Sequence, residues 1–313
     1  MRLDDLPESG NVEDRREGGG FGGGGGFGLP IGGGGLSIGA IVALGLIGWA
    51  LGIDPSLLIG GAEVLTGPSR PQVQAPPTAR RTTAPQDEMG RFVSRVLGST
   101  ELQWKQVFAH DGRIYRAPVL VHYRGATQAS CGGQAQSAMG PFYCPADQKV
   151  YLDTSFFDQI ATRFRGCDAG SRTCQFSEAY VIAHEVGHHV QNLLGILPKA
   201  QQAQRAADSR AAANHIQVQV ELQADCLAGV WANRENEMLK NEGKPAFIEP
   251  GDVEAALRTA AAIGDDTLQR RARGYVVPDS FTHGSSEQRQ RWFNTGFRSG
   301  SVASCNTFAA AQL

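Results

Sequence analysis

The chain has almost no excess of charge of either sign. Its 313 residues include 29 lysines and arginines against 31 aspartates and glutamates, for a net charge of −2 at pH 7. Proteins that bind nucleic acids or other polyanions depend on an excess of basic residues, and this composition gives no such indication. We therefore expect no nucleic-acid partner.

Two other kinds of site lack their sequence signatures. The glycine tract GGGFGGGGGFG at 18–28 has no strand–turn–helix setting, which phosphate-binding loops require. None of the six cysteines is in C-x-x-C spacing, so neither a cysteine zinc knuckle nor a dithiol redox motif is predicted.

The six cysteines instead predict disulfides. Two pairs of close neighbours lie in sequence rich in glycine, aspartate and serine, and two cysteines remain. An even count of this kind is typical of an exported domain, whereas buried free thiols in a cytosolic protein are the alternative. The predicted pairs are Cys131–Cys144, Cys167–Cys174 and Cys226–Cys305.

An uncharged apolar run, LSIGAIVALGLIGWALGI, occupies residues 36–53. It has the minimum length for a transmembrane helix, and the long polar stretch before it argues against a cleaved signal peptide. Arg2, Arg15 and Arg16 precede the run, and the next basic residue is Arg70. This bias predicts a single-pass anchor with the N-terminus in the cytoplasm and the large domain outside, periplasmic or extracellular.

Composition divides the rest of the chain. Residues 1–35 are polar and then rich in glycine, and we predict that they are disordered. Residues 54–87 are rich in Pro, Thr and Gln and predict an extended linker. Residues 88–313 have the composition of one ordinary globular domain.

Within that domain, hydrophobic periodicity predicts an α+β fold that is mainly helical. A small sheet precedes the helix that carries HEVGH, and Ser177 is the expected N-cap of that helix. The strand at 149–153 is a candidate to pair with an extended peptide substrate. The predicted helices cover 87–98, 100–109, 176–195, 206–236, 251–263 and 285–297, and the predicted strands lie within 117–125 and 149–157.

The stretch AHEVGHHV at 183–190 contains the H-E-x-x-H pattern. On a helix, His184 and His188 lie one turn apart on one face, the spacing at which two imidazoles bind one tetrahedral cation. Glu185 projects about 100° round the helix, where it can reach an activated water molecule. His189 points too far round to share the ion and is predicted to be a core or supporting histidine. The alternative, the polar edge of a solvated helix, is disfavoured by the apolar residues on both sides.

A catalytic zinc ion needs a third protein ligand and one open position. In VELQADCLAGVWA at 220–232, Glu221 and Asp225 share one face of a predicted apolar helix. Two buried acids are costly unless each has a partner. We predict that Glu221 is the third ligand and that Asp225 accepts the outer N–H of a ligating histidine. An exposed acidic pair is the alternative.

Together these segments resemble a known family. H-E-x-x-H followed some thirty residues later by E-x-x-x-D is similar to the gluzincin arrangement. HEVGHHVQ, ELQADCLAGVWA, GYVVPDSFTHGSSEQR and RWFNTGF resemble the bacterial neutral zinc metallopeptidases, whose members also have an NVEDRR-type start, a glycine-rich segment and one membrane span. The resemblance covers nearly the whole chain and implies a zincin-like fold and peptidase chemistry.

A second resemblance concerns THGSSEQR at 282–289, which is similar to the H-P-x-x-x-E-R segment of membrane metalloproteases such as the prenyl-protein endopeptidases. It implies that His283 faces the developing oxyanion and that Arg289 supports the site. The sequence departs from that pattern at Gly284 and Gln288, which puts the role of Arg289 in doubt. Tyr275 is a weaker candidate for the oxyanion role.

These residues predict a zinc-dependent endopeptidase with one catalytic zinc ion, bound by His184, His188 and Glu221, in which Glu185 accepts a proton from an activated water. A protein or peptide substrate and the membrane are the expected partners. Two alternatives remain open: a membrane-tethered zinc-containing binding or regulatory module without turnover, and a zinc amidase that acts on the cell wall.

Overall fold

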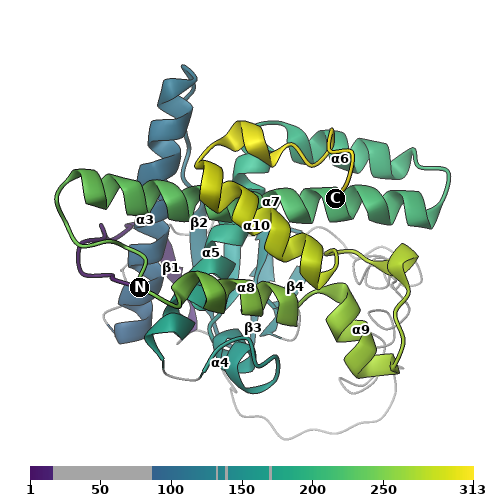
Figure 1. The fold of residues 1–313 in the computed structure, drawn as a ribbon, viewed down its shortest axis with the longest axis horizontal. Helices are drawn as coiled ribbons and strands as arrows, with labels where there is room; N and C mark the ends of the chain where they lie inside the picture. Colours follow the sequence, from purple (N-terminus) through teal and green to yellow (C-terminus); the bar gives the residue numbers. More distant parts are fainter. Residues whose placement is uncertain (17–86, 132, 138–139, 169–170) are drawn as a thin grey trace, which may run out of the picture.

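A computed structural model describes residues 1–16, 87–131, 133–137, 140–168 and 171–313 (Figure 1). The apolar run predicted to span a membrane, 36–53, lies outside these residues, as does the predicted linker apart from Asp87. Within the described ranges, no helix is both long enough and apolar enough to cross a bilayer.

Helices dominate the described structure, and a small sheet precedes the helix that carries HEVGH. The prediction of a mainly helical α+β fold is confirmed. The strands are β1 (Val12–Asp14), β2 (Val119–Tyr123), β3 (Ala126–Ala129), β4 (Gly133–Gln136), β5 (Phe142–Cys144) and β6 (Lys149–Asp153). The α-helices are α3 (Glu88–His110), α4 (Ser155–Thr162), α5 (Arg172–Leu193), α6 (Ile196–Arg205), α7 (Arg210–Asn241), α8 (Asp252–Ala262), α9 (Asp265–Arg273) and α10 (Ser286–Ser299), and the short 3-10 helices are η4 (Pro278–Ser280) and η5 (Val302–Cys305).

The main sheet has four strands in the order β1-β2-β6-β5. The first three are parallel, with Leu120 opposite Val150, and β5 is antiparallel to β6 at one edge. Side chains alternate between the two faces, so Leu120 and Val150 join the helical core while Val121 and Tyr151 pack with Ala135 of the β3–β4 hairpin. Burial on both faces explains the consecutive buried apolar residues Leu120 and Val121 in β2 and Val150 and Tyr151 in β6. Because β6 lies between β2 and β5, the prediction that residues 149–153 pair with substrate is wrong.

The helices form layers over this sheet. Helix α5 packs against the sheet at β5 and β6. Helices α7 and α8 pack on α5, and α10 packs on α7 and α8 (Figure 1). Two glycines bring α7 and α10 together: a Cβ at Gly296 would lie 1.9 Å from the carbonyl oxygen of Cys226, and one at Gly229 would lie 2.2 Å from that of Phe293. Only glycine permits so close an approach of two helix backbones.

Several helix boundaries differ from the prediction. The helices expected at 87–98 and 100–109 form one helix, α3, because Ser99 and Thr100 at the expected break are buried and continue it. Helix α5 begins with Ser171 as its N-cap, whose side chain accepts a hydrogen bond from the N–H of Cys174, and Ser177 lies buried inside the helix. Helices α4, α6 and α9 were not predicted.

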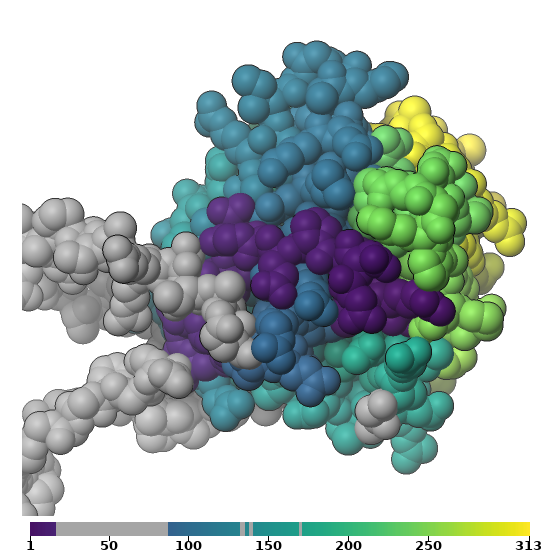
Figure 2. All heavy atoms as spheres, turned by 90° about the vertical axis from the view of Figure 1, so that its left-hand side faces the viewer, coloured from purple at the N-terminus to yellow at the C-terminus, as the bar shows by residue number. Residues whose placement is uncertain are grey.

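Residues 1–16 are an ordered part of the domain, so the prediction of disorder over 1–35 is wrong for this segment. Val12 is fully buried in β1, and Leu6 is 5% exposed. The side chains of Ser9 and Asn11 both donate hydrogen bonds to Glu101 of α3. Figure 2 shows the segment, in purple, lying across the face that α3 forms. Val12 is buried by pairing with Leu120, more than 100 positions away, which local periodicity cannot indicate.

The two sides of the undescribed segment 17–86 meet in the folded structure. The guanidinium of Arg16 donates hydrogen bonds to Asp14 and to Asp87, the N-cap of α3. Residue 16 therefore lies beside residue 87, and residues 1–16 and 88–313 form a single folded unit.

All three predicted disulfides are present in the structure: Cys131–Cys144, Cys167–Cys174 and Cys226–Cys305. The last joins α7 to η5 across 79 residues of sequence and so fixes the C-terminal segment to the helix that carries Glu221.

Candidate metal centre

Helices α5 and α7 come together at Gly187, between the two histidines of HEVGH. A Cβ at this position would lie 3.0 Å from the carbonyl oxygen of Ala224 on α7. The absent side chain thus lets the two backbones approach. Glu221 and Asp225 lie within a turn of Ala224 on α7, and both carboxylates contact His184.

His184, His188 and Glu221 converge on one point. Their ligand atoms all lie within 4.8 Å of one another. Glu221 Oε2 lies 3.2 Å from His184 Nε2 and 3.5 Å from His188 Nε2. Ligands at zinc–nitrogen and zinc–oxygen distances of about 2.0–2.1 Å, placed tetrahedrally, are separated by about 3.4 Å. The three residues could therefore hold a metal ion, and the separations suit zinc.

The carboxylate of Glu221 is oriented by a neighbour on its own helix. Gln217, four residues earlier on α7, donates a hydrogen bond from Nε2 to Glu221 Oε1 at 2.8 Å. This bond occupies one oxygen and leaves Oε2 facing the two imidazoles. Gln217 was not predicted, although its spacing places it on the same helix face as Glu221.

Asp225 contacts the outer nitrogen of His184, the role that the sequence assigns to it. His184 Nδ1 lies 2.8 Å from Asp225 Oδ1. A carboxylate accepts but cannot donate, so Nδ1 carries the proton and Nε2 points to Glu221 with its lone pair available in the neutral ring. Asp225 itself is fully buried and has a cation beside it, Arg289 of α10.

Tyr180 is a further member of this network that the sequence analysis missed. Its hydroxyl donates to Asp225 Oδ1 at 2.5 Å and accepts from Arg289 Nη2 at 3.1 Å. Tyr180 precedes His184 by one helical turn, so the two side chains share a face of α5. That spacing is the only sequence signal that could have indicated it.

The electrostatics of His184, His188 and Glu221, which we call the trio, favour a bound cation. Burial lowers the pKa of His184, but the Asp225 carboxylate, with Glu221, outweighs burial and raises the pKa to about 10. Burial acts to raise the pKa of Glu221, but the two imidazoles outweigh burial and hold this pKa well below its usual range. The site thus keeps a buried negative charge that attracts protons or a metal ion.

Glu185 lies beside the trio and is 7% exposed. Its negative charge is among the causes that raise the pKa of both His184 and His188. Glu185 is not one of the three candidate metal ligands, so its carboxylate is available to accept a proton.

His283 lies on the loop between η4 and α10, outside the trio. Its side chain is 48% exposed, and Nδ1 lies 3.0 Å from Thr282 Oγ1 and 3.5 Å from Asp265 Oδ1. Gly284 packs on Leu222, so the loop lies against α7 next to Glu221. The structure thus places His283 near the site, but within the described residues it makes no hydrogen bond to the trio.

Two other candidates from the sequence lie elsewhere. His189 is fully buried and its ring contacts Tyr143 Oη at 3.0 Å and the carbonyl oxygen of Arg116 at 2.6 Å, which confirms that it is a core histidine. Tyr275 is 60% exposed on the loop after α9.

Comparison with known proteins gives consistent matches over the chain. The family model described as "Putative neutral zinc metallopeptidase" matches residues 1–308. "Uncharacterized protein YpfJ" of Escherichia coli strain K12 is 47% identical over 310 residues, which cover 98% of this chain and 99% of that protein. "Uncharacterized protein Rv2575" of Mycobacterium tuberculosis strain H37Rv is 42% identical over 234 residues, 72% of this chain and 74% of that protein. No solved structure matches the chain.

Proposed function

Because the chain belongs to the putative neutral zinc metallopeptidase family, we propose that it is a zinc-dependent endopeptidase whose ion is held by His184, His188 and Glu221. The observation that carries the proposal is the convergence of these three buried side chains, from two helices, at separations of 3.2 and 3.5 Å around Glu221 Oε2.

Three protein ligands leave one position of a tetrahedral ion open, as catalytic rather than structural zinc sites require. Zinc bound here would supply Lewis-acid chemistry, activating a water molecule and polarising the carbonyl of the scissile bond. This donor set, two imidazoles and one carboxylate, is one that zinc commonly takes in hydrolases. The open position disfavours a purely structural metal site.

Glu185 acts as the general base in this proposal. It accepts a proton from the attacking water and returns it to the leaving amine, which requires a carboxylate next to the ligands but not bound to the ion. Asp225 and Arg289 hold His184 in the correct tautomer, and His283 is positioned on the adjacent loop to stabilise the developing oxyanion.

We assign the pairing with an extended peptide substrate to strand β5, because β6 is buried between β2 and β5. Strand β5 is at the edge of the sheet, and Tyr143 on it contacts His189 of α5 at 3.0 Å. An extended peptide that pairs with β5 would run alongside the helix that carries the ligands. This arrangement favours a peptide over a compact cell-wall amide as the substrate.

The decisive experiment is the substitution Glu185→Gln. We expect the variant to bind one zinc ion per chain as the wild type does, and to lose cleavage of an unfolded protein such as casein by at least about 100-fold, the contribution of a positioned general base. Glu178→Gln, on the same helix but outside the site, is the matched control and should keep full activity.

The possible outcomes separate the three candidate functions. Undiminished cleavage by Glu185→Gln would exclude the proposed mechanism. Zinc that is retained through dialysis without cleavage of a broad peptide set would favour the binding or regulatory module. Release of fragments from purified cell wall, but not from peptides, would favour the amidase.

The three disulfides support an oxidising compartment, so we propose that the folded domain is exported. Residues 12–14 pair with β2 of this domain, and this pairing supports our proposal that the N-terminal segment lies on the same side of any membrane as the folded domain. Our proposal therefore replaces the predicted cytoplasmic N-terminus with one in the compartment of the catalytic domain.

A further inference from the structure

The two histidines of the trio have different outer partners. His184 Nδ1 faces the Asp225 carboxylate, whereas His188 Nδ1 lies 2.8 Å from Oε1 of a neutral amide, Gln191. Gln191 is one turn further along α5 and is fully buried. The side-chain amide of Gln191 can fix the His188 imidazole only if its oxygen and nitrogen cannot exchange places. The other contacts of the amide therefore determine its effect on His188.

The orientation of the Gln191 amide is set by acceptors on α7. Its Nε2 lies 2.8 Å from the carbonyl oxygen of Val220 and 3.0 Å from Gln223 Oε1. A backbone carbonyl can only accept, so the group that faces it must be the NH₂. Turned over, the amide would place its oxygen against two oxygens in a buried site, which is costly. Oε1 of Gln191 therefore faces His188.

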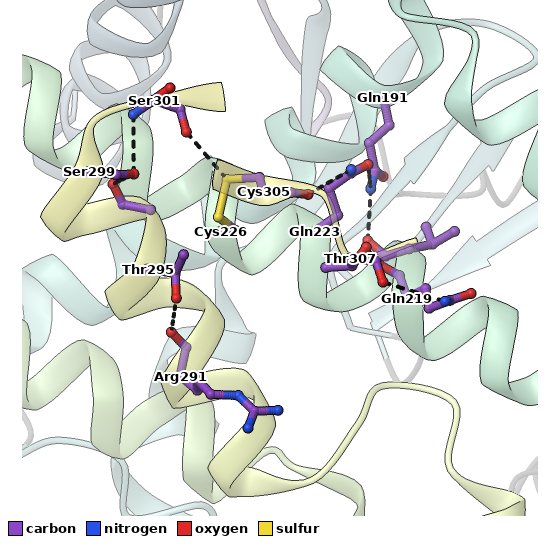
Figure 3. Close-up of a disulfide and its surroundings, with 12 residues drawn as sticks. Gln191, Gln219, Gln223, Cys226, Arg291, Thr295, Ser299, Ser301, Cys305 and Thr307 are labelled. Carbon is purple, nitrogen blue, oxygen red and sulfur yellow. Dashed lines mark hydrogen bonds between the residues drawn. A yellow bond between two sulfur atoms is a disulfide. The ribbon is translucent and has the colours of Figure 1, made fainter. Parts of the chain in front are cut away.

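Gln223 is fixed in the same way at its other end. Its Nε2 donates to the carbonyl oxygen of Cys305 at 2.9 Å, which leaves Oε1 to accept from Gln191 (Figure 3). Gln223 is 7% exposed and Cys305 1%. The two glutamines form a directed chain of hydrogen bonds that begins at His188 and ends at a backbone carbonyl.

The direction of this chain determines the protonation of His188. Gln191 Oε1 only accepts, so Nδ1 of His188 must donate. In the neutral ring, Nε2 then carries the lone pair, and this is the nitrogen that lies 3.5 Å from Glu221 Oε2 in the trio. This chain of hydrogen bonds through Gln191 and Gln223, which we call the relay, therefore selects the tautomer in which His188 can bind a metal ion.

The terminal carbonyl is held in place by a covalent link. Cys305 is bonded to Cys226 of α7, one residue after Asp225. A second contact follows in the same segment, where Thr307 Oγ1 donates to the carbonyl oxygen of Gln219 at 2.7 Å. Figure 3 shows the disulfide, Gln223 and Gln191 in one continuous cluster between α7 and the C-terminal segment.

We propose that Gln191 and Gln223 are positioning residues for metal binding, and that the Cys226–Cys305 disulfide anchors the carbonyl on which their orientation depends. The proposal rests on the metal centre of the proposed function but not on its chemistry. It assigns a role in the site to residues from the C-terminal segment, far from H-E-x-x-H in the sequence.

The test measures zinc affinity by competition with a chromophoric chelator in the full chain. Replacing an outer partner of a metal-binding histidine typically weakens binding by roughly 10–100-fold. We expect a loss in this range for Gln191→Met, and a smaller loss in the same direction for Gln223→Met and for Cys226→Ser combined with Cys305→Ser.

Two matched controls separate the relay from general loosening of the fold. Gln219→Met alters a glutamine on α7 that contacts Thr307 in the same C-terminal segment, at 3.4 Å, but lies outside the relay. Cys131→Ser combined with Cys144→Ser removes a different disulfide. Both should bind zinc within about twofold of the wild type, well inside the effect expected of an outer partner.

A spectroscopic measurement complements the affinities. In the zinc-loaded wild type, the ring ¹⁵N shifts of His188 should identify Nε2 as the metal-bound nitrogen and Nδ1 as the N–H. If Gln191→Met fails to fold, Gln223→Met and the Cys226/Cys305 variant decide the matter. Unchanged zinc affinity in those folded variants, or coordination through Nδ1, would overturn the relay. Zinc binding that responds to the relay without any peptide cleavage would overturn only the proposed function.

Discussion

The guanidinium of Arg289 binds both carboxylate oxygens of Asp225, with nitrogen–oxygen distances of 2.8 and 2.9 Å, and both side chains are buried. The pair connects α10 to α7, and through Asp225 to His184 of α5. A cation at this position lets Asp225 stay ionised without solvent, and the pKa of the carboxyl lies far below its usual range despite the opposing effect of burial. The same charge is then available to orient the imidazole.

Removing Arg289 should therefore destabilise the whole domain. Arg289→Met leaves Asp225 as a buried charge without its cation, and breaking such a pair typically costs about 3–5 kcal/mol. Urea unfolding should show this loss. Arg298→Met, on the exposed side of the same helix, is the control and should change the free energy of unfolding by less than about 0.5 kcal/mol. Equal stability of the two variants would show that the pair contributes little.

Glu221 should dominate zinc affinity among the acids of α7. Glu221→Gln removes a charged ligand and should weaken zinc binding by more than the roughly 10–100-fold that follows loss of an outer partner. Glu235→Gln makes the same change at a fully buried acid on the same helix, where burial raises the pKa and an amide replaces the carboxyl group with little change in shape. Comparable zinc affinity in these two variants would remove Glu221 from the ligand set.

His122 should make the domain sensitive to acid. It is wholly buried in β2, and burial lowers its pKa from 6.5 to about 4. A group whose pKa is depressed on folding contributes its full stability above the unfolded pKa and loses it as the pH falls towards the folded value. Between about pH 6.5 and pH 4 this amounts to about 3 kcal/mol. Urea unfolding of wild type and His122→Gln at several pH values should show a steeper decline in the wild type, and parallel declines would contradict the assignment.

Gly98 of α3 should resist replacement by alanine. Alanine usually stabilises a helix interior relative to glycine by up to about 1 kcal/mol. At this position, however, a Cβ would lie 2.1 Å from the carbonyl oxygen of Pro7, which is a backbone atom of the N-terminal segment. Gly98→Ala should instead destabilise the domain by about 1–3 kcal/mol and speed amide exchange of β1. A stabilised variant with protected β1 amides would show that residues 1–16 do not pack on α3.

The packing of residues 1–16 also fixes which regions share a compartment. Single cysteines at two exposed positions, Asp4→Cys in the N-terminal segment and Lys240→Cys in α7, should react with a membrane-impermeant thiol reagent from the same side of the membrane in intact cells. Reaction of only one of them before lysis, with both reacting afterwards, would support the opposite-sided arrangement and contradict the strand pairing of β1.

Local sequence was sufficient for much of the candidate site. The four-residue spacings of His184 with His188 and of Glu221 with Asp225 place each pair on one helix face, and apolar neighbours indicate that both faces are buried. The helix start at Ser171 was missed because Ser177 is an equally good capping residue by type. Tyr180, Gln191 and Gln217 were missed because an isolated polar residue in a helix gives no sign of its partner.

The sequence by itself determined the ligand types, their helical spacing and the fold class, because these depend on the period of the backbone and on which side chains bind metals. The tertiary structure decided which residues from other parts of the chain reach the two histidines and their supporting side chains. Packing at Gly187 lets α7 approach so closely that Glu221 meets the histidines, and the path of the C-terminal segment, which the Cys226–Cys305 disulfide links to α7, places a backbone carbonyl beside Gln223. Contacts between residues far apart in sequence depend on the path of the whole chain, which is why residues 1–16 proved to be an ordered segment that adds strand β1 to the sheet.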